Sequence, residues 1–342
     1  MTWGPMRSVL LALALSATCA GAAEPPPFVL EATIPLESTS GRIDHMAVDL
    51  RRQRLYVAEL GNGTVDAIDL TARKVVGRID GLKEPQGVGY AAKADLIVVA
   101  SAGDGSVRFY RGEDWAAAGV LPLGDDADNV RVDDRSGTVV VGYGTGGLAI
   151  IDPMTRSKVA DIHLPAHSEG FQLDPARDRA FVNVPDAREV AVIDLSGARA
   201  LASWRVPGAL GNFPMAYDAI GMEVAIVTRS PPELIVLDAA QGQVKVRKLA
   251  CGDSDDVFLD RRRRRIYISC GSGEVDAWQQ TGTDYRPLPP TRTGGGARTS
   301  LFVPELDRLF VAERAGLIGS RAAILVLRPQ EGAPHERPNG GH

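Results

Sequence analysis

The sequence lacks several features that would have indicated particular functions. It contains three cysteines, Cys19, Cys251 and Cys270, and no CxxCH motif, which argues against covalently bound haem. The two later cysteines have no histidines close by in sequence, so they make a weak case for zinc. After the N-terminal region no run is apolar for long enough to cross a membrane, so we expect no transmembrane segment.

Clustered positive charge is also missing. The formal net charge is −5, and a phosphate backbone calls for a basic face, so we expect no nucleic-acid partner. The longest basic run, Arg261–Arg265, falls between two expected strands. We therefore predict that it forms a solvated turn.

The first 22 residues have the pattern of a secretion signal. Arg7 supplies the positive region, Val9–Ala17 the short apolar stretch and Ala20–Ala22 a small-residue cleavage site. The pattern predicts an exported protein, periplasmic or secreted, whose mature chain starts near Ala23. A lipid anchor on Cys19 is the lesser alternative, because the bulky Thr18 fits a lipid-attachment motif poorly.

Cleavage of the signal would leave two cysteines in the mature chain. An exported compartment permits a disulfide, and Cys251 and Cys270 should lie towards the same face of one structural repeat. Their separation in space does not follow from the sequence, so both a bond and two free thiols remain open.

A short element recurs seven times along the chain, just upstream of a predicted strand. Its copies are spaced by 42, 42, 41, 44, 42 and 44 residues. A period of about 40–50 residues filled by strands is typical of β-propeller blades. The predicted fold is therefore an all-β, seven-bladed β-propeller with four antiparallel strands per blade. The anchor residues of the seven copies are Asp44, Gln86, Asp128, Glu169, Phe213, Asp255 and Thr299.

The two ends of the chain predict how the ring closes. The seventh repeat ends after its third strand, and a spare strand, Phe28–Leu36, precedes the first repeat. We predict that it pairs with Ala322–Leu327 as the outer strand of the last blade, which removes exposed sheet edges. The propeller domain would span residues 23–329, and residues 330–342, rich in Pro, Gly and charge, would form a disordered tail.

Three segments of the repeats resemble a known family. LYVAELGNGTVDAIDL, IYISCGSGEVDAW and LFVAERAG are similar to the repeats of YVTN-type, YncE-like secreted seven-bladed β-propellers. The resemblance covers nearly the whole mature chain and implies the fold. It implies little about function, because most YncE-like members have no clear chemistry and a shared fold does not carry an activity.

The repeat alignment gathers polar residues at one mouth of the central channel. The loops that enter the innermost strands share that face, so their side chains should converge around the channel axis. We predict that this mouth binds a small molecule or a protein, and that the chain is a monomer. The predicted ligand-binding residues are Asp44, His45, Gln86, Asp128, Asn129, Glu169, Asp255, Asp256, Arg298 and Ser300.

Carboxylates gathered around one mouth repel one another unless something compensates them. A divalent cation such as calcium is one candidate, because hard cations prefer carboxylate and amide oxygens. A cationic organic ligand is a second candidate, and internal neutralisation by Arg229, Arg298 and His45 is a third. The candidate metal ligands are Asp44, Asp128, Glu169 and Asp255.

The leading functional prediction is a non-catalytic binding or scaffold protein. The alternatives are a metal-dependent, lactonase-like hydrolase and a helper in redox or cofactor-biogenesis chemistry. The alignment also places Ser300, His45 and Asp44 near one another, which allows a Ser–His–Asp arrangement. No nucleophile-elbow sequence accompanies Ser300, so the sequence gives this arrangement little support.

Overall fold

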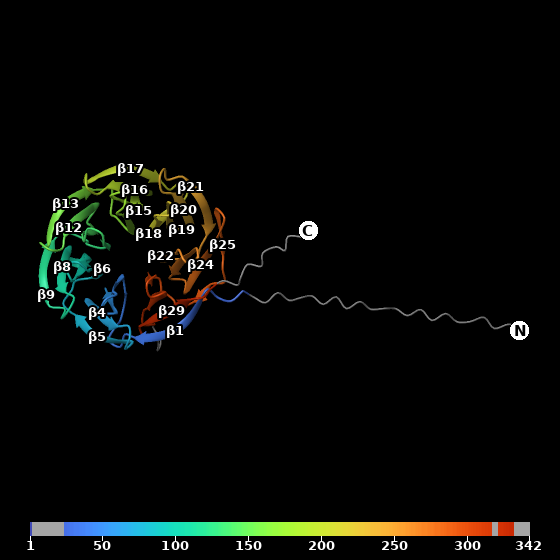
Figure 1. Cartoon of the computed structure of the whole chain (residues 1–342), viewed down its shortest axis with the longest axis horizontal. Helices are drawn as coiled ribbons and strands as arrows, with labels where there is room; N and C mark the ends of the chain where they lie inside the picture. The colour runs from blue at the N-terminus through green and yellow to red at the C-terminus, as the bar shows by residue number, and fades with distance from the viewer. Residues whose placement is uncertain (2–23, 317–320, 332–342) are drawn as a thin grey trace.

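A computed structural model describes Met1 and residues 24–316 and 321–331 of the chain. Seven β-sheets stand around a central channel, each with its first strand innermost (Figure 1). The predicted seven-bladed β-propeller is therefore confirmed. The expected signal peptide and most of the expected tail lie outside the described residues. No described helix has the length and apolar character needed to cross a membrane.

The strands of each blade are given from the channel outward. Blades 1 to 3 contain β2 (Met46–Asp49), β3 (Arg54–Glu59), β4 (Thr64–Asp69) and β5 (Lys74–Ile79); β6 (Pro85–Ala91), β7 (Leu96–Ser101), β8 (Ser106–Arg111) and β9 (Ala117–Pro122); β10 (Val130–Val132), β11 (Val139–Tyr143), β12 (Gly147–Asp152) and β13 (Ser157–His163). Blades 4 and 5 contain β14 (Phe171–Asp174), β15 (Arg179–Val184), β16 (Glu189–Asp194) and β17 (Arg199–Arg205); β18 (Leu210–Asp218), β19 (Glu223–Ser230), β20 (Pro232–Asp238) and β21 (Val244–Leu249). Blades 6 and 7 contain β22 (Ser254–Asp260), β23 (Arg265–Cys270), β24 (Glu274–Thr281) and β25 (Asp284–Pro287); β27 (Ser300–Val303), β28 (Arg308–Glu313), β29 (Ala323–Pro329) and β1 (Phe28–Pro35).

Three short elements complete the described structure. Strand β26 (Thr291–Arg292) pairs with β24 in blade 6. Two 3-10 turns, η1 (Ala102–Asp104) and η2 (Pro185–Ala187), join the second and third strands of blades 2 and 4.

The ring closes as the sequence predicts. Strand β1 pairs antiparallel with β29, from Phe28 opposite Pro329 to Pro35 opposite Ala323. The side chain of Phe28 also lies 4.5 Å from the ring of Tyr267 in blade 6, measured between ring centroids. The two described ends leave the propeller side by side (Figure 1), and the Gln330 amide donates to the Pro27 carbonyl at 2.7 Å. Gln330, placed in the tail by the sequence, is thus held against the first strand.

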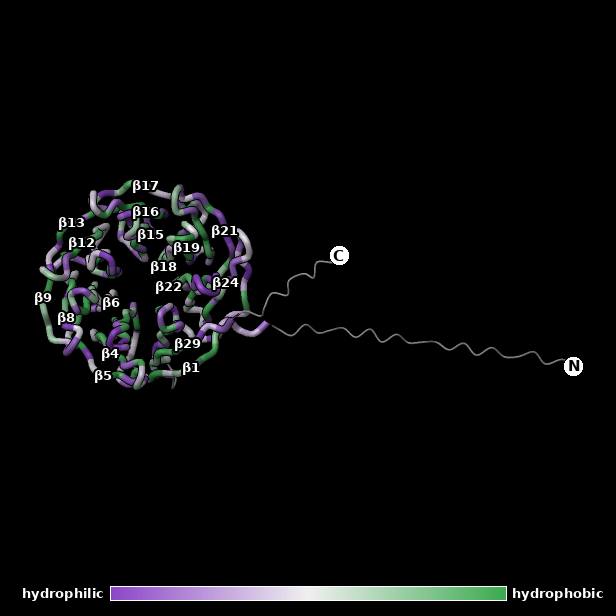
Figure 2. Tube along the Cα trace, viewed as in Figure 1, coloured by the Kyte–Doolittle hydropathy of each residue, from purple (hydrophilic) through white to green (hydrophobic). Residues whose placement is uncertain are grey.

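The hydrophobic core lies between blades rather than inside one of them. Seven clusters of buried apolar side chains are found among the described residues, and each is shared by two neighbouring blades. The cluster between blades 7 and 1, for example, joins Ile34 and Ile324 to Leu55 and Ile68. Both faces of the middle strands are therefore apolar, and hydrophobic and hydrophilic stretches alternate along the trace (Figure 2).

Two glycines allow the innermost strands to approach at the mouth. A Cβ on Gly87 would lie 1.9 Å from the Asp128 carbonyl oxygen, and one on Gly170 would lie 2.5 Å from the Phe213 carbonyl oxygen. A backbone hydrogen bond crosses the second of these contacts, since the Gly170 amide donates to the Phe213 carbonyl at 3.0 Å. These contacts fix the spacing of the anchor residues around the channel.

At the channel end opposite the mouth, ion pairs join neighbouring blades. Arg52 lies 2.8 Å from Asp49 on its own turn and 2.7 Å from Asp95 in the next blade. Arg263 repeats the arrangement, 3.0 Å from Asp260 and 2.6 Å from Asp307. We call these two sets the far-end clasps: Asp49–Arg52–Asp95 and Asp260–Arg263–Asp307.

The predicted solvated turn at Arg261–Arg265 is wrong for two of its residues. Arg263 is 8% exposed and Arg265 is 4% exposed. Arg263 is held in the second clasp, and Arg265 donates to the Gln330 carbonyl at 2.7 Å. The remaining positions match the prediction better, because Arg262 is two-thirds exposed at its side chain.

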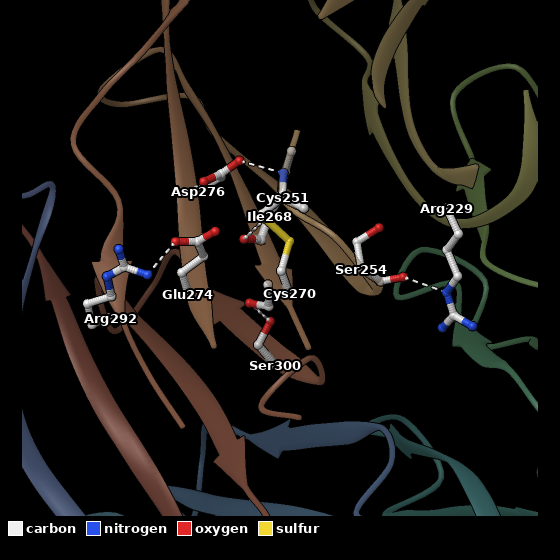
Figure 3. The surroundings of a disulfide bond; sticks show 10 residues. Arg229, Cys251, Ser254, Ile268, Cys270, Glu274, Asp276, Arg292 and Ser300 are labelled. Atoms are coloured by element: carbon white, nitrogen blue, oxygen red, sulfur yellow. Dashed lines mark hydrogen bonds and ion pairs between the residues drawn. A yellow bond between two sulfur atoms is a disulfide. The ribbon is translucent and has the colours of Figure 1, made fainter. Parts of the chain in front are cut away.

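A disulfide joins Cys251 and Cys270, whose Cα atoms are 5.9 Å apart (Figure 3). Cys251 lies in the loop that enters blade 6, and Cys270 ends the second strand of that blade. The Cys251 amide also donates to Asp276 at 2.9 Å. The bond therefore anchors a mouth loop of blade 6 to its own sheet, in line with one of the two outcomes that the sequence left open.

Candidate functional site

A small cavity occupies the channel at the mouth. Its volume is about 50 Å³, and its walls come from blades 1, 3, 4, 5 and 6. Seven of the ten predicted residues line it, and they belong to the loops and strand starts that the repeat alignment placed together. These seven are Asp44, His45, Asp128, Asn129, Glu169, Asp255 and Asp256.

The other three predicted residues support the mouth without lining this cavity. The Gln86 carbonyl accepts a hydrogen bond from the His45 amide at 3.2 Å. Arg298 forms ion pairs with the carboxylates of blade 6. Ser300 is buried, its amide donates to Asp256 Oδ2 at 2.7 Å, and its hydroxyl lies 2.7 Å from that of Ser269.

On the blade 6 side of the mouth, arginines neutralise the carboxylates. Arg298 Nε lies 2.5 Å from Asp255 Oδ2, and Arg298 Nη1 lies 2.8 Å from Asp253 Oδ1. Arg229 pairs with Asp255 as well, and its guanidinium stacks over the Phe213 ring at 4.1 Å. Internal compensation, one of the three explanations that the sequence left open, therefore applies to this part of the mouth.

On the blade 1 side, one carboxylate is buried beside one arginine. Asp44 is 2% exposed, and Arg42 Nη2 lies 2.7 Å from Asp44 Oδ2. Burial raises the pKa of Asp44 well above its usual range, and the attraction of Arg42 offsets that rise only in part. Burial lowers the pKa of the neighbouring His45, whose Nε2 lies 3.8 Å from Asp44.

Between blades 3 and 4 the carboxylates have no arginine or lysine partner. Asp128, Glu169 and His167 each direct a ligand atom to one point, and these atoms lie within 4.8 Å of one another. Of the described residues, none with a guanidinium or ammonium group forms an ion pair with Asp128 or Glu169. We call Asp128, His167 and Glu169 the blade 3–4 cluster.

The electrostatics of the blade 3–4 cluster reflect this lack of compensation. Burial and the charge of Asp128 raise the pKa of Glu169 to about 8. Asp128 beside the imidazole is the main cause that raises the pKa of His167 to about 9, against the opposing effect of burial. Each group therefore favours the state that reduces the net negative charge at this point.

Two oxygens at the same place have no hydrogen-bond donor. Asp128 Oδ1 and Asn129 Oδ1 are buried without a partner, and their residues are 6% and 2% exposed. A buried acceptor left unpaired costs roughly 1–3 kcal/mol. Both residues line the cavity, so the two unpaired oxygens belong to its wall.

A half-buried arginine, Arg131, lies further along the innermost strand of blade 3. Arg131 donates to the Val130 carbonyl at 2.9 Å and lies over the Phe171 ring at 5.4 Å. Burial lowers the pKa of Arg131, and burial raises the pKa of Asp256 well above its usual range. These two opposite charges share the cavity wall below the blade 3–4 cluster.

The described residues do not form the Ser–His–Asp arrangement that the sequence allowed. The Ser300 hydroxyl is paired with that of Ser269, and the His45 imidazole faces Asp44 at 3.8 Å. A nucleophilic serine needs a base in hydrogen-bond reach of its hydroxyl. No such bond between Ser300 and a histidine is found among the described residues.

The predicted set left out Arg42 and Arg131, which line the cavity. The residue of the blade 3–4 cluster that it left out is His167. It lies two positions before Glu169, and the residues at the same position of the other repeats include Arg42, Glu84, Asp126 and Asp253. Polar side chains thus recur there as well as at the anchors. That second recurring position is the signal that would have included His167.

These features define a seven-bladed β-propeller with a partly uncompensated acidic channel mouth. No protein-family model and no curated protein matches the sequence, so membership of the YVTN, YncE-like family stays a prediction. Solved structures with this fold are numerous, with 1754 matching chains, which is why the fold selects no function. One of them, hydrazine synthase of Kuenenia stuttgartiensis, is 13% identical with a TM-score of 0.72, and the match covers 84% of this chain and 97% of that chain.

Proposed function

We propose that the chain is an exported binding protein that takes up a divalent cation at its acidic channel mouth. The observation that carries this proposal is the pair of buried oxygens without donors, Asp128 Oδ1 and Asn129 Oδ1, beside carboxylates without an arginine or lysine partner. A cation would accept lone pairs from the unpaired oxygens and would also neutralise the charge of the carboxylates.

The size of the cavity favours an ion over a cationic organic ligand. A site for a drug-sized molecule commonly measures about 300–1,000 Å³. The mouth cavity, at about 50 Å³, has room for an ion and a few water molecules. The third explanation, neutralisation by Arg229, Arg298 and His45, accounts for Asp253 and Asp255. None of these three pairs with Asp128 or Glu169, and the imidazole of His167 is what faces Asp128 in the blade 3–4 cluster.

Two features support export. The first 22 residues have the composition of a secretion signal, and the Cys251–Cys270 disulfide suits an oxidising compartment. Extracellular calcium modules work with dissociation constants of about 0.1–1 mM, so even a weak calcium site can be filled outside the cytoplasm.

Isothermal titration of chelator-treated full-length protein tests the proposal. We expect one divalent ion per chain, with an affinity in or tighter than the millimolar range of extracellular calcium sites. Elemental analysis of protein purified without chelator should find the same ion. The variant Asp128→Asn should lose binding, and Asp95→Asn, which removes a carboxylate at the opposite channel end, should keep it. If no divalent cation binds to the wild-type chain, the proposal is wrong.

The same preparation also separates the binding function from the hydrolase alternative. A hydrolase would turn over lactones or related esters only when the cation is present, because the ion would activate the attacking water. For a binding protein we expect no turnover with or without the cation.

A further inference from the structure

We propose that the cation is a first-row transition ion such as Zn²⁺, held by Asp128, Glu169 and His167, rather than calcium held by the four predicted carboxylates. This inference rests on the proposed function, because it concerns the same mouth. It differs from the predicted set by replacing Asp44 and Asp255 with one imidazole.

The geometry of the blade 3–4 cluster suits a small ion. Its three ligand atoms lie within 4.8 Å of one another, and His167 Nε2 is 3.9 Å from Asp128 Oδ2. In a tetrahedral site with metal–ligand distances near 2.0–2.2 Å, ligand atoms are about 3.3 Å apart. Small side-chain rotations would therefore close the cluster on an ion, without a change in the propeller backbone.

The orientation of His167 is fixed for metal binding by its other ring nitrogen. Nδ1 lies 2.6 Å from the Gly144 carbonyl oxygen, which can only accept a hydrogen bond, so Nδ1 carries a proton. Nε2 therefore faces Asp128, and binding of a metal ion would displace its proton and use the lone pair that the proton occupies. Histidines that bind metals have this arrangement in most proteins, since the second hydrogen bond sets the tautomer and aligns the ring.

The loop around Gly144 holds this arrangement in place. The Gly144 amide donates to the Asp125 carbonyl at 3.0 Å, and Gly144 has a positive φ of 58°. Asp126 Oδ2 lies 3.6 Å from His167 Nδ1 and adds a negative charge behind the ring. Both contacts come from blade 3, whereas His167 comes from the loop that enters blade 4.

An observation independent of the acidic residues points to a ligand at the same place. Asn129 is uncharged and 2% exposed, and its Oδ1 has no donor although it lines the cavity. A water molecule bound to the ion would supply that donor. Asp128 Oδ1 is in the same condition, so the carboxylate has an oxygen free for coordination.

The other carboxylates of the predicted metal set already have cationic partners. Asp255 is paired with two arginines, and Asp44 with one. A cation placed on them would compete with a guanidinium that is covalently part of the protein. An imidazole with two carboxylates selects zinc and its neighbours, whereas calcium prefers six to eight oxygens.

The test compares two histidines that line or border the same mouth. Chelator-treated full-length chain is titrated with Zn²⁺ and with Ca²⁺, and the same is done for His167→Gln and for the matched control His45→Gln. We expect Zn²⁺ to bind more tightly than Ca²⁺. Loss of His167 should weaken Zn²⁺ binding by at least about 100-fold, and loss of His45 by less than about threefold.

Co²⁺ provides a second readout that does not depend on affinity. In the wild-type chain it should give the visible absorption of a four- or five-coordinate ion, and this absorption should be absent from His167→Gln. Thermal melts of the metal-free variants show that each one folds.

The outcomes separate the inference from the proposed function. Zn²⁺ binding that is equal in the wild type and in His167→Gln would overturn the inference and leave a cation-binding mouth. Tighter binding of Ca²⁺ than of Zn²⁺ would also overturn the inference. It would favour the four predicted carboxylates as the ligands of the cation. A wild-type chain that binds neither ion would overturn both.

Discussion

Both ends of the channel carry aspartates, and the two ends compensate these charges in different ways. At the far end Asp49 and Asp260 are almost fully buried, yet each has an arginine three residues further along its own turn. At the mouth Asp128 and Glu169 come from different blades and have no such arginine. The difference separates charges that hold the blades together from charges that remain available to a ligand.

The reason for the difference is local. In a D-x-x-R turn the arginine lies beside the carboxylate because the backbone of the turn brings them together, and Asp49 Oδ1 also accepts from the amides of Arg51 and Arg52. At the mouth the anchor residues lie near the starts of the innermost strands, where neighbours in space include residues of the next blade. Compensation there needs a partner from another repeat, as Arg229 and Arg298 provide for Asp255.

The largest expected effect comes from opening the ring, which would disrupt the far end and the mouth of the channel together. Deletion of residues 24–36 takes away β1 with the buried side chains Phe28, Ile34 and Leu36. Each is worth about 2–5 kcal/mol, and their sum approaches the whole stability of a domain. We expect an aggregating or unfolded protein in a thermal melt, whereas deletion of residues 332–342 should melt like the full chain. Equal melting of both truncations would contradict the closure.

The next largest effect is a loss of stability at the far end that leaves cation binding at the mouth unchanged. Arg263→Ala removes the guanidinium between Asp260 and Asp307 and leaves buried carboxylate behind. Breaking a buried ion pair in this way costs about 3–5 kcal/mol. Chemical denaturation should show this loss, while cation binding at the mouth should be unaffected.

The neighbouring arginine is the matched control. Arg262 also pairs with Asp307, but its side chain is 66% exposed. Its replacement by alanine should change the free energy of unfolding by no more than about 0.5–1 kcal/mol. If Arg262→Ala and Arg263→Ala destabilise the protein equally, burial is not what makes the clasp strong.

At the mouth we expect the opposite change in stability, because removal of a carboxyl should stabilise the metal-free protein. Glu169→Gln removes a half-buried carboxyl whose pKa is raised to about 8, so the metal-free variant should be more stable than the wild type by about 1–2 kcal/mol at neutral pH. The same variant should bind the cation less tightly. Glu84→Gln, an exposed carboxylate of a neighbouring mouth loop, should change neither property. Destabilisation by Glu169→Gln would show that the mouth is compensated after all.

The smallest expected effect is the acid sensitivity of the far end. The guanidinium of Arg52 lowers the pKa of Asp95 to about 2, below its ordinary value near 3.8. A lowered carboxyl pKa gives stability that is present above about pH 4 and is lost as the pH falls towards 2. Melting temperatures of the wild type should fall over this range, and those of Asp95→Asn should fall less. If the melting temperatures of the two proteins fall in parallel, groups other than Asp95 cause the acid sensitivity.

Much of the fold follows from the spacing of residues in the sequence. The period near 42 residues predicted the seven blades, and the unmatched strands at the two ends predicted the closure by β1. These features depend on neighbours along the chain or on simple counting of strands. The burial of Arg263 was not predicted, because a run of arginines carries no sign of which one faces the next blade.

The candidate site was predictable in part. Seven of ten residues were placed in the cavity wall because one repeat position maps to one height of the channel. His167 was missed, since only one repeat has a histidine there. Whether any of these residues binds a cation remains a prediction for the titrations above.

The sequence by itself determined the repeat, the number of blades and the face on which acidic residues gather, because strands and turns depend on local order. Only the tertiary structure decided which of those acids are neutralised. Asp255 meets arginines from blades 5 and 7, and Asp128 meets His167 across the contact between blades 3 and 4. Such pairs depend on the reach of side chains from different repeats, and Coulomb energies change steeply over a few ångströms when water is excluded.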